Sequence, residues 1–239
     1  MLTSAGRVLF GVAMVGFGLE QAVLGTLRDG MPTPPFWMPH SLVLGYLSAA
    51  VLLLGGLALV AGWRVRGVAL VVGLFLVVSA LLHLTHWHAV VFRGDERTAL
   101  FEPLALGGAA LMLVSQRGVV RVGGVSFGLA MIMFGVQHFM YADIAALVPR
   151  WIPWHHFWVV FTGVVMIAGG LAVLLRVGGA FAAVSLAAMF FGWLVLLHIP
   201  LCVAAPKSGE LWASALVVLG LCGASLIVAG GGAGGRRSR

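Results

Sequence analysis

One unit of this chain occurs twice. Phe10–Gly18 reads FGVAMVGFG and Phe127–Gly135 reads FGLAMIMFG, so six of nine positions are identical at an offset of 117. Further matches at offsets of 114 or 115 pair Trp37–Pro39 with Trp151–Pro153, Gly55–Ala58 with Gly169–Ala172, Leu81–His83 with Leu196–His198, and Glu96 with Glu210. A repeat of this length constrains the fold more than any single segment does, because both copies must suit one architecture. We therefore expect two domains, at residues 1–116 and 117–239.

Apolar residues dominate both copies. They make up 62% of the chain, charged residues make up 9%, and the mean hydropathy is +1.11. A soluble domain carries about 25% charged residues, so this chain cannot cover itself with a polar surface. We expect an all-α integral membrane protein with eight transmembrane helices, arranged as two parallel four-helix-bundle repeats, since about 20 apolar residues span a bilayer. The expected spans are residues 6–27, 40–62, 67–89, 100–115, 122–142, 155–175, 179–203 and 211–231.

The first apolar stretch follows Arg7 and so has the pattern of a signal peptide. It is also the repeat partner of the internal stretch 122–142, which predicts that it is a helix of the folded protein. The fourth stretch is short unless it begins nearer to Thr98.

Basic residues in the connectors predict the orientation. Nine of them fall on the side of the two termini, and five fall on the other side, where acidic residues accompany them. The positive-inside rule then places both termini on the cytoplasmic side. We expect the membrane to be a bacterial inner membrane. Each repeat has an even number of spans, so the two repeats share one orientation and a pseudo-twofold axis along the membrane normal. The basic residues form no patch of the kind that binds nucleic acid.

Cys202 and Cys222 belong to no C-x-x-C motif. On successive antiparallel helices their depths differ by roughly 10–15 Å, which exceeds the approximately 7 Å between Cα atoms that a disulfide allows. We expect both to fill apolar space.

With this topology the ionisable residues of the helices gather in one outer layer. Such residues are costly at membrane depth and usually face a cavity or a partner, so the layer predicts an outward-facing polar site. The alternative is that they hydrogen-bond lipid head groups and cap helix ends. The layer contains Glu20, Gln21, His40, His83, His86, His88, Glu102, His138, His155, His156 and His198.

His83 and His86 share a helical face, as two ligands of one metal must. His138 or His198 can supply a third ligand, with Glu20 or Glu102 orienting a ring. However, the second repeat has Leu201 in place of His86, and no zinc or di-iron spacing is complete. We assign no metal.

His83 and His198 are repeat equivalents, so the pseudo-twofold axis predicts that they lie at one depth. Facing each other, they can hold a haem iron through both axial positions. They can equally hydrogen-bond a quinone-like carbonyl, or a carbonyl of a neighbouring helix. All three alternatives stay open.

A polar pair ends the first helix of each repeat: Glu20-Gln21 in the first and Gln137-His138 in the second. We expect each pair to point into its own four-helix bundle. Glu20 can exchange a proton near the outer surface, or it can pair with Arg28 or a histidine.

The second repeat contains four further landmarks: Phe134–Phe139 (FGVQHF), Leu147–Pro153 (LVPRWIP), Gly163 and Gly169–Leu171. In these motifs it resembles the DoxX-like family of small four-helix membrane proteins. It covers residues 122–203 directly and residues 7–115 through the repeat, where Gln21 replaces His138.

The resemblance implies quinone-coupled oxidoreduction, since the family is similar to the membrane subunits of thiosulfate:quinone oxidoreductase. Relatives are also associated with dithiol or oxidative-stress complexes, but this chain is doubled and lacks a cysteine pair. We expect a quinone-associated oxidoreductase subunit or accessory, catalytic or not, in the lipid bilayer with other membrane or periplasmic subunits. The alternatives are a structural subunit and a small-solute carrier. The residues expected to bind the quinone, or alternatively haem, are His83, His86, His138 and His198, and those expected to move protons are Glu20 and Glu102.

Overall fold

The computed structural model describes residues 1–24, 31–39, 41–141 and 148–234, and the regular elements in these ranges are helices. His40, Arg28, Asp29 and Asp143 lie outside the described residues. In chain order the elements are α1 (Leu2–Leu24), α2 (Leu42–Ala61), α3 (Val65–Leu82), η1 (His83–His86), α4 (Trp87–Phe92), α5 (Gly94–Leu111), α6 (Arg117–Met140), α8 (His155–Leu175), α9 (Gly179–Trp193), η2 (Leu194–His198), α10 (Ile199–Ala204) and α11 (Gly209–Gly234).

Seven helical stretches of the described chain are long and apolar enough to cross a membrane, one fewer than the eight expected. These stretches are Leu2–Val23, Leu42–Ala61, Val65–Phe92, Arg117–Met140, His155–Leu175, Gly179–Ala204 and Gly209–Gly231. The difference is α5, which starts at Gly94 instead of near residue 100 and therefore includes Asp95, Glu96 and Arg97. These charges lower its hydropathy below that of the other long helices.

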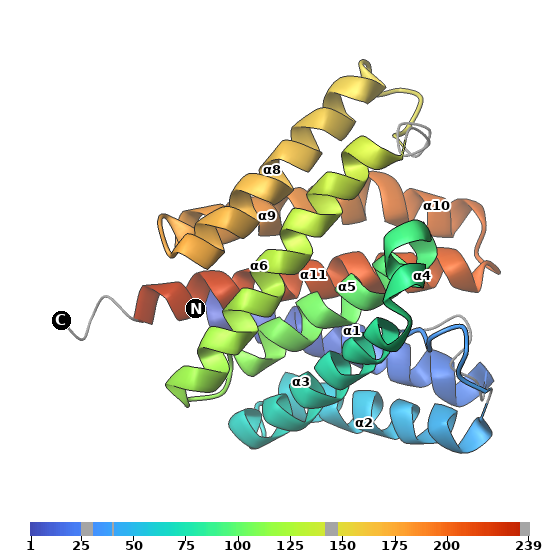
Figure 1. Cartoon of the computed structure of the whole chain (residues 1–239), viewed down its shortest axis with the longest axis vertical. Coiled ribbons are helices and arrows are strands. Elements are labelled where there is room, and N and C mark those ends of the chain that lie inside the picture. Colours follow the sequence, from blue (N-terminus) through green and yellow to red (C-terminus); the bar gives the residue numbers. More distant parts are fainter. Residues whose placement is uncertain (25–30, 40, 142–147, 235–239) are drawn as a thin grey trace.

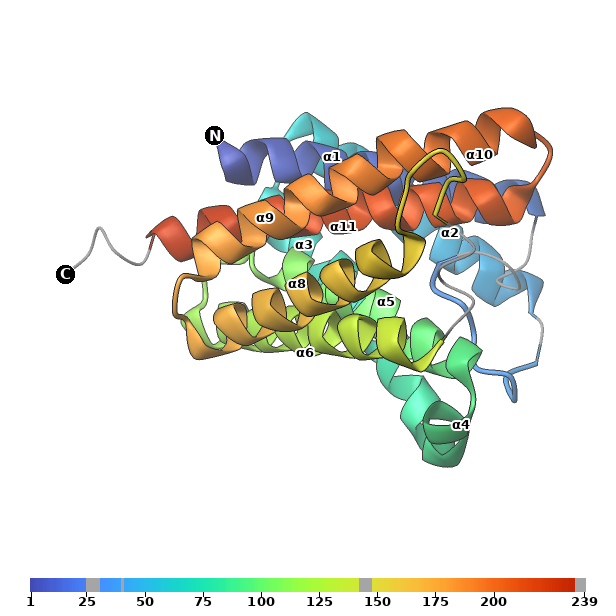
Figure 2. The same cartoon turned by 90° about the horizontal axis from the view of Figure 1, so that it is seen from above.

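The interior position of α5 explains why it tolerates those charges. Twelve of its 18 residues are buried, and it packs against α3, α6 and α11. Protein, not lipid, surrounds most of it, so its polar groups find partners inside the molecule. Figures 1 and 2 show both chain termini at one end of the molecule, with α4 and α10 at the other.

The two halves of the chain are interleaved. Within each half, the first helix packs on the second, α1 on α2 and α6 on α8. The fourth helix of each half packs on the first helix of the other, α5 on α6 and α11 on α1, and α5 also contacts α11 (Figure 1). The arrangement therefore differs from two separate four-helix bundles, in which each fourth helix would pack on the first helix of its own half. It also brings the polar ends of α5 and α11 together at the centre.

Repeat-equivalent glycines make equivalent helix contacts. A Cβ on Gly56 of α2 would stand 2.7 Å from the carbonyl oxygen of Gly11 on α1, and a Cβ on Gly170 of α8 would stand 2.5 Å from that of Gly128 on α6. Only glycine permits this backbone approach, which membrane helices use for packing. Two further equivalent contacts are Gly18 with Leu53 matched by Gly135 with Ile167, and Gly55 with Val72 matched by Gly169 with Leu186.

The second helix of each half also ends in the same way. Gly62 follows α2 with φ 74° and Arg176 follows α8 with φ 57°, both in the left-handed region. At both helix ends the N–H of the following residue donates to the carbonyl five residues earlier: Trp63 to Ala58 at 2.9 Å, and Val177 to Ala172 at 3.1 Å. This is the Schellman pattern. The guanidinium of Arg7 donates to the last carbonyls of α2, at Leu59 and Val60, where a cation is favoured by the helix dipole.

Candidate functional site

Two cavities adjoin the polar half of α5. Cavity 1 has a volume of about 300 Å³ and is lined by Phe17, Met31, Thr33, Glu102, His198, Glu210, Ala213, Ser214, Val217 and Val218. Cavity 2 has a volume of about 320 Å³ and is lined by Thr98, Glu102, Phe134, Gln137, His138, Tyr141, Met166, Phe190, Trp193, Val217, Val218 and Leu221. Volumes near 300 Å³ are at the small end of the range for ligand sites. Each cavity contains one histidine, and Glu102 belongs to both.

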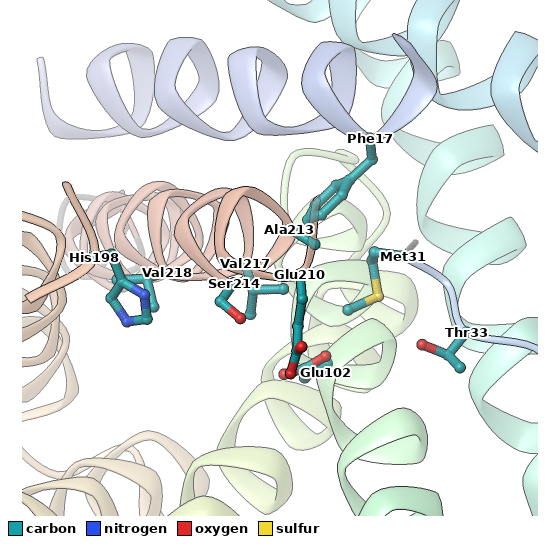
Figure 3. A pocket seen from close by; sticks show the side chains of 10 residues that line it. All are labelled: Phe17, Met31, Thr33, Glu102, His198, Glu210, Ala213, Ser214, Val217 and Val218. Atoms are coloured by element: carbon teal, nitrogen blue, oxygen red, sulfur yellow. The ribbon is translucent and has the colours of Figure 1, made fainter. Parts of the chain in front are cut away.

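Two carboxyl groups face cavity 1. Glu102 projects from α5 and Glu210 from the first turn of α11, and their carboxyl groups point to the same part of the cavity (Figure 3). The positive end of the α11 dipole favours an acid at Glu210. The ion pairs of the described residues join His83 to Glu96 and Arg93 to Asp95, so neither cavity carboxylate has a basic partner there. Such a pair of acids is suited to holding a proton or a hydrogen-bond donor.

A widened helical turn places His198 at the wall of cavity 1. In η2 (Leu194–His198) the helix has π geometry, and the N–H of Ile199 donates to the carbonyl of Leu194. Pro200 follows and has no N–H to continue the α pattern, which favours such a local widening. Figure 3 shows the His198 imidazole apart from the carboxyl groups of Glu102 and Glu210, with Ser214 between them.

Cavity 2 is an aromatic counterpart with one polar wall. The ring of His138 stacks on Trp193, with 5.6 Å between the ring centroids and 22° between the ring planes. Its Nδ1 lies 2.7 Å from the carbonyl oxygen of Phe134 and therefore donates to it. In the neutral ring Nε2 is then the acceptor, and among the described residues it has no hydrogen-bond partner. Gln137 donates to the hydroxyl of Thr98 at 3.1 Å and fixes this wall to α5.

His83 lies in a separate, fully occupied site. Its Nδ1 is 2.7 Å from Glu96 Oε2, and its Nε2 is 3.1 Å from the carbonyl oxygen of Thr33. The N–H of Phe36 donates to Glu96 Oε1 at 3.3 Å, and Gln21 donates to the carbonyl of Met31 at 2.8 Å. We call residues 31–36 the strap, because these bonds tie the segment to α1, η1 and α5. Both ring nitrogens of His83 are engaged, so neither is available to an axial iron or an external carbonyl.

The remaining predicted site residues line neither cavity. His86 is exposed on η1, with its ring 5.4 Å from that of Phe36 and 5.5 Å from that of Trp37. Glu20 belongs to α1 and is half-buried against the start of α11. Its Oε1 lies 3.9 Å from the position that a Cβ on Gly209 would take. The structure therefore places Glu102, His138 and His198 at the two cavities, whereas His83, His86 and Glu20 line neither cavity. In the described part of the chain no three His, Cys, Asp or Glu side chains are placed to hold a metal ion.

The site also contains residues that sequence reasoning did not assign to it. Glu210 faces His198 across cavity 1, Glu96 closes on His83, and Trp193 covers His138. The signal for the two acids was their equivalence in the repeat, each following an equivalent histidine. Trp193 had no comparable signal, because a tryptophan near a helix end also suits the lipid interface.

Comparisons of this chain with family models, with curated proteins and with solved structures find no match. The site must therefore be interpreted from its own geometry.

Proposed function

We propose that this chain is a tandem DoxX-like membrane protein that binds a quinone-type head group beside Glu102, as a subunit or accessory of an oxidoreductase. The observation that carries the proposal is that Glu102 lines two cavities, each with one histidine, and that cavity 2 has mostly apolar walls. Ligand sites combine a mostly apolar lining with a few polar groups that fix orientation. A quinone head group has this chemistry, a planar conjugated ring with carbonyl oxygen atoms at opposite edges.

The roles follow from the contacts. Trp193 and His138 offer an aromatic face to the ring. The unprotonated Nε2 of His138 can accept a hydrogen bond from a hydroxyl group of the reduced, quinol form. Glu102 lies where it can exchange a proton with a ligand in either cavity, as general acid–base transfer requires. The glycine and cap contacts shared by the two halves support the tandem arrangement, with domains at 1–116 and 117–239 and eight crossings. The nine basic residues on the side of the termini support a cytoplasmic location for that end of a bacterial inner-membrane protein.

The test is to purify the protein in a mild detergent and extract the bound lipids. Quinone in the extract is then separated by reversed-phase chromatography and quantified by its absorbance. We expect a quinone to co-purify with the wild-type chain. Glu102→Gln, Trp193→Leu and His138→Leu should each reduce the amount retained, and Trp63→Leu serves as a matched control, because Trp63 lies at the opposite end, next to α2. Wild-type protein without quinone that keeps a stable protein partner would instead favour the structural-subunit alternative.

A further inference from the structure

A buried arginine links the end of α4 to a residue in the wall of cavity 2. Arg97 of α5 is only 6% exposed. Its Nε donates to the carbonyl of Val90 at 3.2 Å, and its Nη2 donates to the carbonyl of Val91. Its Nη1 donates to the hydroxyl oxygen of Tyr141 at 2.8 Å. Arg97 takes part in no ion pair among the described residues, so carbonyl and hydroxyl oxygen atoms compensate its charge.

The hydroxyl group of Tyr141 lies close against the start of α5. A Cβ on Gly94, the first residue of α5, would overlap the hydroxyl oxygen, so glycine permits this approach. The same oxygen accepts from Arg97, three residues further along the helix. A phenol hydroxyl also has one proton to donate. In the described part of the chain no acceptor receives that proton.

Tyr141 and His138 bring complementary polar groups to cavity 2. Tyr141 directly follows α6, and both residues line the cavity. They are three residues apart and therefore lie on one side of the helix end. The neutral ring of His138 offers Nε2 as an acceptor, whereas Tyr141 offers a hydroxyl proton. A quinone has carbonyl oxygen atoms, which only accept hydrogen bonds, so Tyr141 can bind it through its hydroxyl and the neutral His138 cannot bind it through Nε2.

We infer that Tyr141 donates a hydrogen bond to a carbonyl oxygen of the ring in cavity 2, and that Arg97 strengthens this bond. The inference rests on the proposed function and specifies a residue that recognises the oxidised, quinone form. The guanidinium group is charged, and hydrogen bonds from charged donors are the strong ones. Successive hydrogen bonds in a chain also polarise one another, so the bond from Arg97 makes the Tyr141 hydroxyl a better donor. Arg97 acts through Tyr141 and is a positioning residue.

The first test is calorimetric titration of the whole chain in lipid nanodiscs with tetramethyl-1,4-benzoquinone, with empty nanodiscs as the blank. Tyr141→Phe removes the hydroxyl group and keeps the ring. We expect it to weaken quinone binding about tenfold, in line with the loss of one hydrogen bond. The chain has two tyrosines, and Tyr46→Phe is the matched control, because Tyr46 is exposed on α2 and lines neither cavity. This control should bind quinone as the wild type does.

An infrared measurement separates hydrogen bonding from a structural role. A donated hydrogen bond lowers the stretching frequency of a carbonyl group. We expect one carbonyl band of the bound quinone to lie below its position in empty nanodiscs, and to return to that position in Tyr141→Phe. Incorporating 3-fluorotyrosine in the Tyr46→Phe background modifies position 141 alone. Fluorine makes the hydroxyl a stronger donor, so the band should move lower still, and this comparison decides the matter even if Tyr141→Phe fails to fold.

The outcomes distinguish this inference from the proposed function. Wild-type affinity and an unshifted carbonyl band in Tyr141→Phe overturn the inference and leave quinone binding in place. Weaker binding by Tyr141→Phe together with a band that 3-fluorotyrosine does not move also overturns it, because Tyr141 then has only a structural role. Absence of saturable quinone binding by the wild-type chain overturns both proposals.

Discussion

His83 and Glu96 form a buried pair, with 2.7 Å between Nδ1 and Oε2 and side-chain exposures of 1% and 8%. Both ring nitrogens of His83 face oxygen atoms, of Glu96 and of the Thr33 carbonyl. Two protons must therefore be shared between the imidazole and the carboxyl group, either as imidazolium and carboxylate or as imidazole and carboxylic acid. In both cases the pair is neutral as a whole, which makes its burial tolerable.

Removing one member of this pair should strongly destabilise the protein. We expect Glu96→Gln and His83→Gln each to lower the free energy of unfolding by about 3–5 kcal/mol, because the remaining group loses its partner in a buried site. The measurement is chemical or thermal unfolding in detergent. The double variant should lose less than the sum of the two single variants, since it leaves no lone charge. Additive losses would show that the two side chains act independently.

The glycines at the α1–α2 and α6–α8 crossings should respond equally to substitution. Gly56→Ala and Gly170→Ala each introduce a methyl group within 2.7 and 2.5 Å of a backbone carbonyl oxygen. We expect each to destabilise the protein by about 1–3 kcal/mol, the usual cost of overpacking, measured by unfolding as above. Gly124→Ala is the control within α6, because its nearest neighbour is a methionine sulfur 3.9 Å away. A large effect at only one of the two crossings would contradict their equivalence.

Site-directed labelling can test the crossing of α5. The background carries Cys202→Ala and Cys222→Ala, so that neither of the two native thiols, which are free and buried, can react. Arg93→Cys and Lys207→Cys, exposed at the end opposite to the termini, should react with a membrane-impermeant maleimide on intact cells. Ser115→Cys, exposed between α5 and α6, should react only after permeabilisation. Equal labelling of positions 93 and 115 on intact cells would mean that α5 does not cross.

Asp95, which is exposed in the first turn of α5, should show an acid-shifted titration. The hydrogen bond from Arg93 holds the pKa of Asp95 below its ordinary 3.8. A lowered pKa in the folded state means that the contact stabilises fully at neutral pH and loses its effect as the pH falls through the lowered pKa. Carbon-detected NMR of labelled aspartate should show one resonance titrating below pH 3.8, and Arg93→Gln should return that resonance to the ordinary range. An unchanged titration in Arg93→Gln would remove the assigned cause.

Much of the helical layout could be predicted from apolar runs. The expected span 155–175 coincides with α8, and the expected span 179–203 ends one residue before α10 does. The fourth span failed at its start, because a search for apolar runs excludes the charged first turn of α5. That search assumes that every helix meets lipid, whereas α5 meets other helices. Periodicity does not reveal which helices will be shielded in this way.

The site could be predicted only in part. Glu102, His138 and His198 were recognised as polar residues of one layer, and the structure places them around adjoining cavities. Repeat symmetry predicts that His83 and His198 lie at one depth and leaves their hydrogen-bond partners open. A loop segment without any apolar pattern, the strap, satisfies His83. Loop conformation depends on particular hydrogen bonds, so repeat symmetry could place the helix and could not place the partner of its histidine.

The burial of α5 among its neighbours has a consequence for biogenesis. Two of the helices that cover it, α6 and α11, follow it in the chain, and α11 leaves the ribosome later than α6. A segment with four ionisable side chains in 18 residues gains little from entering lipid by itself, so its stable insertion depends on helices not yet made. The nascent protein must therefore keep α5 in the translocon, or in a hairpin with α6, until α11 arrives and completes the assembly.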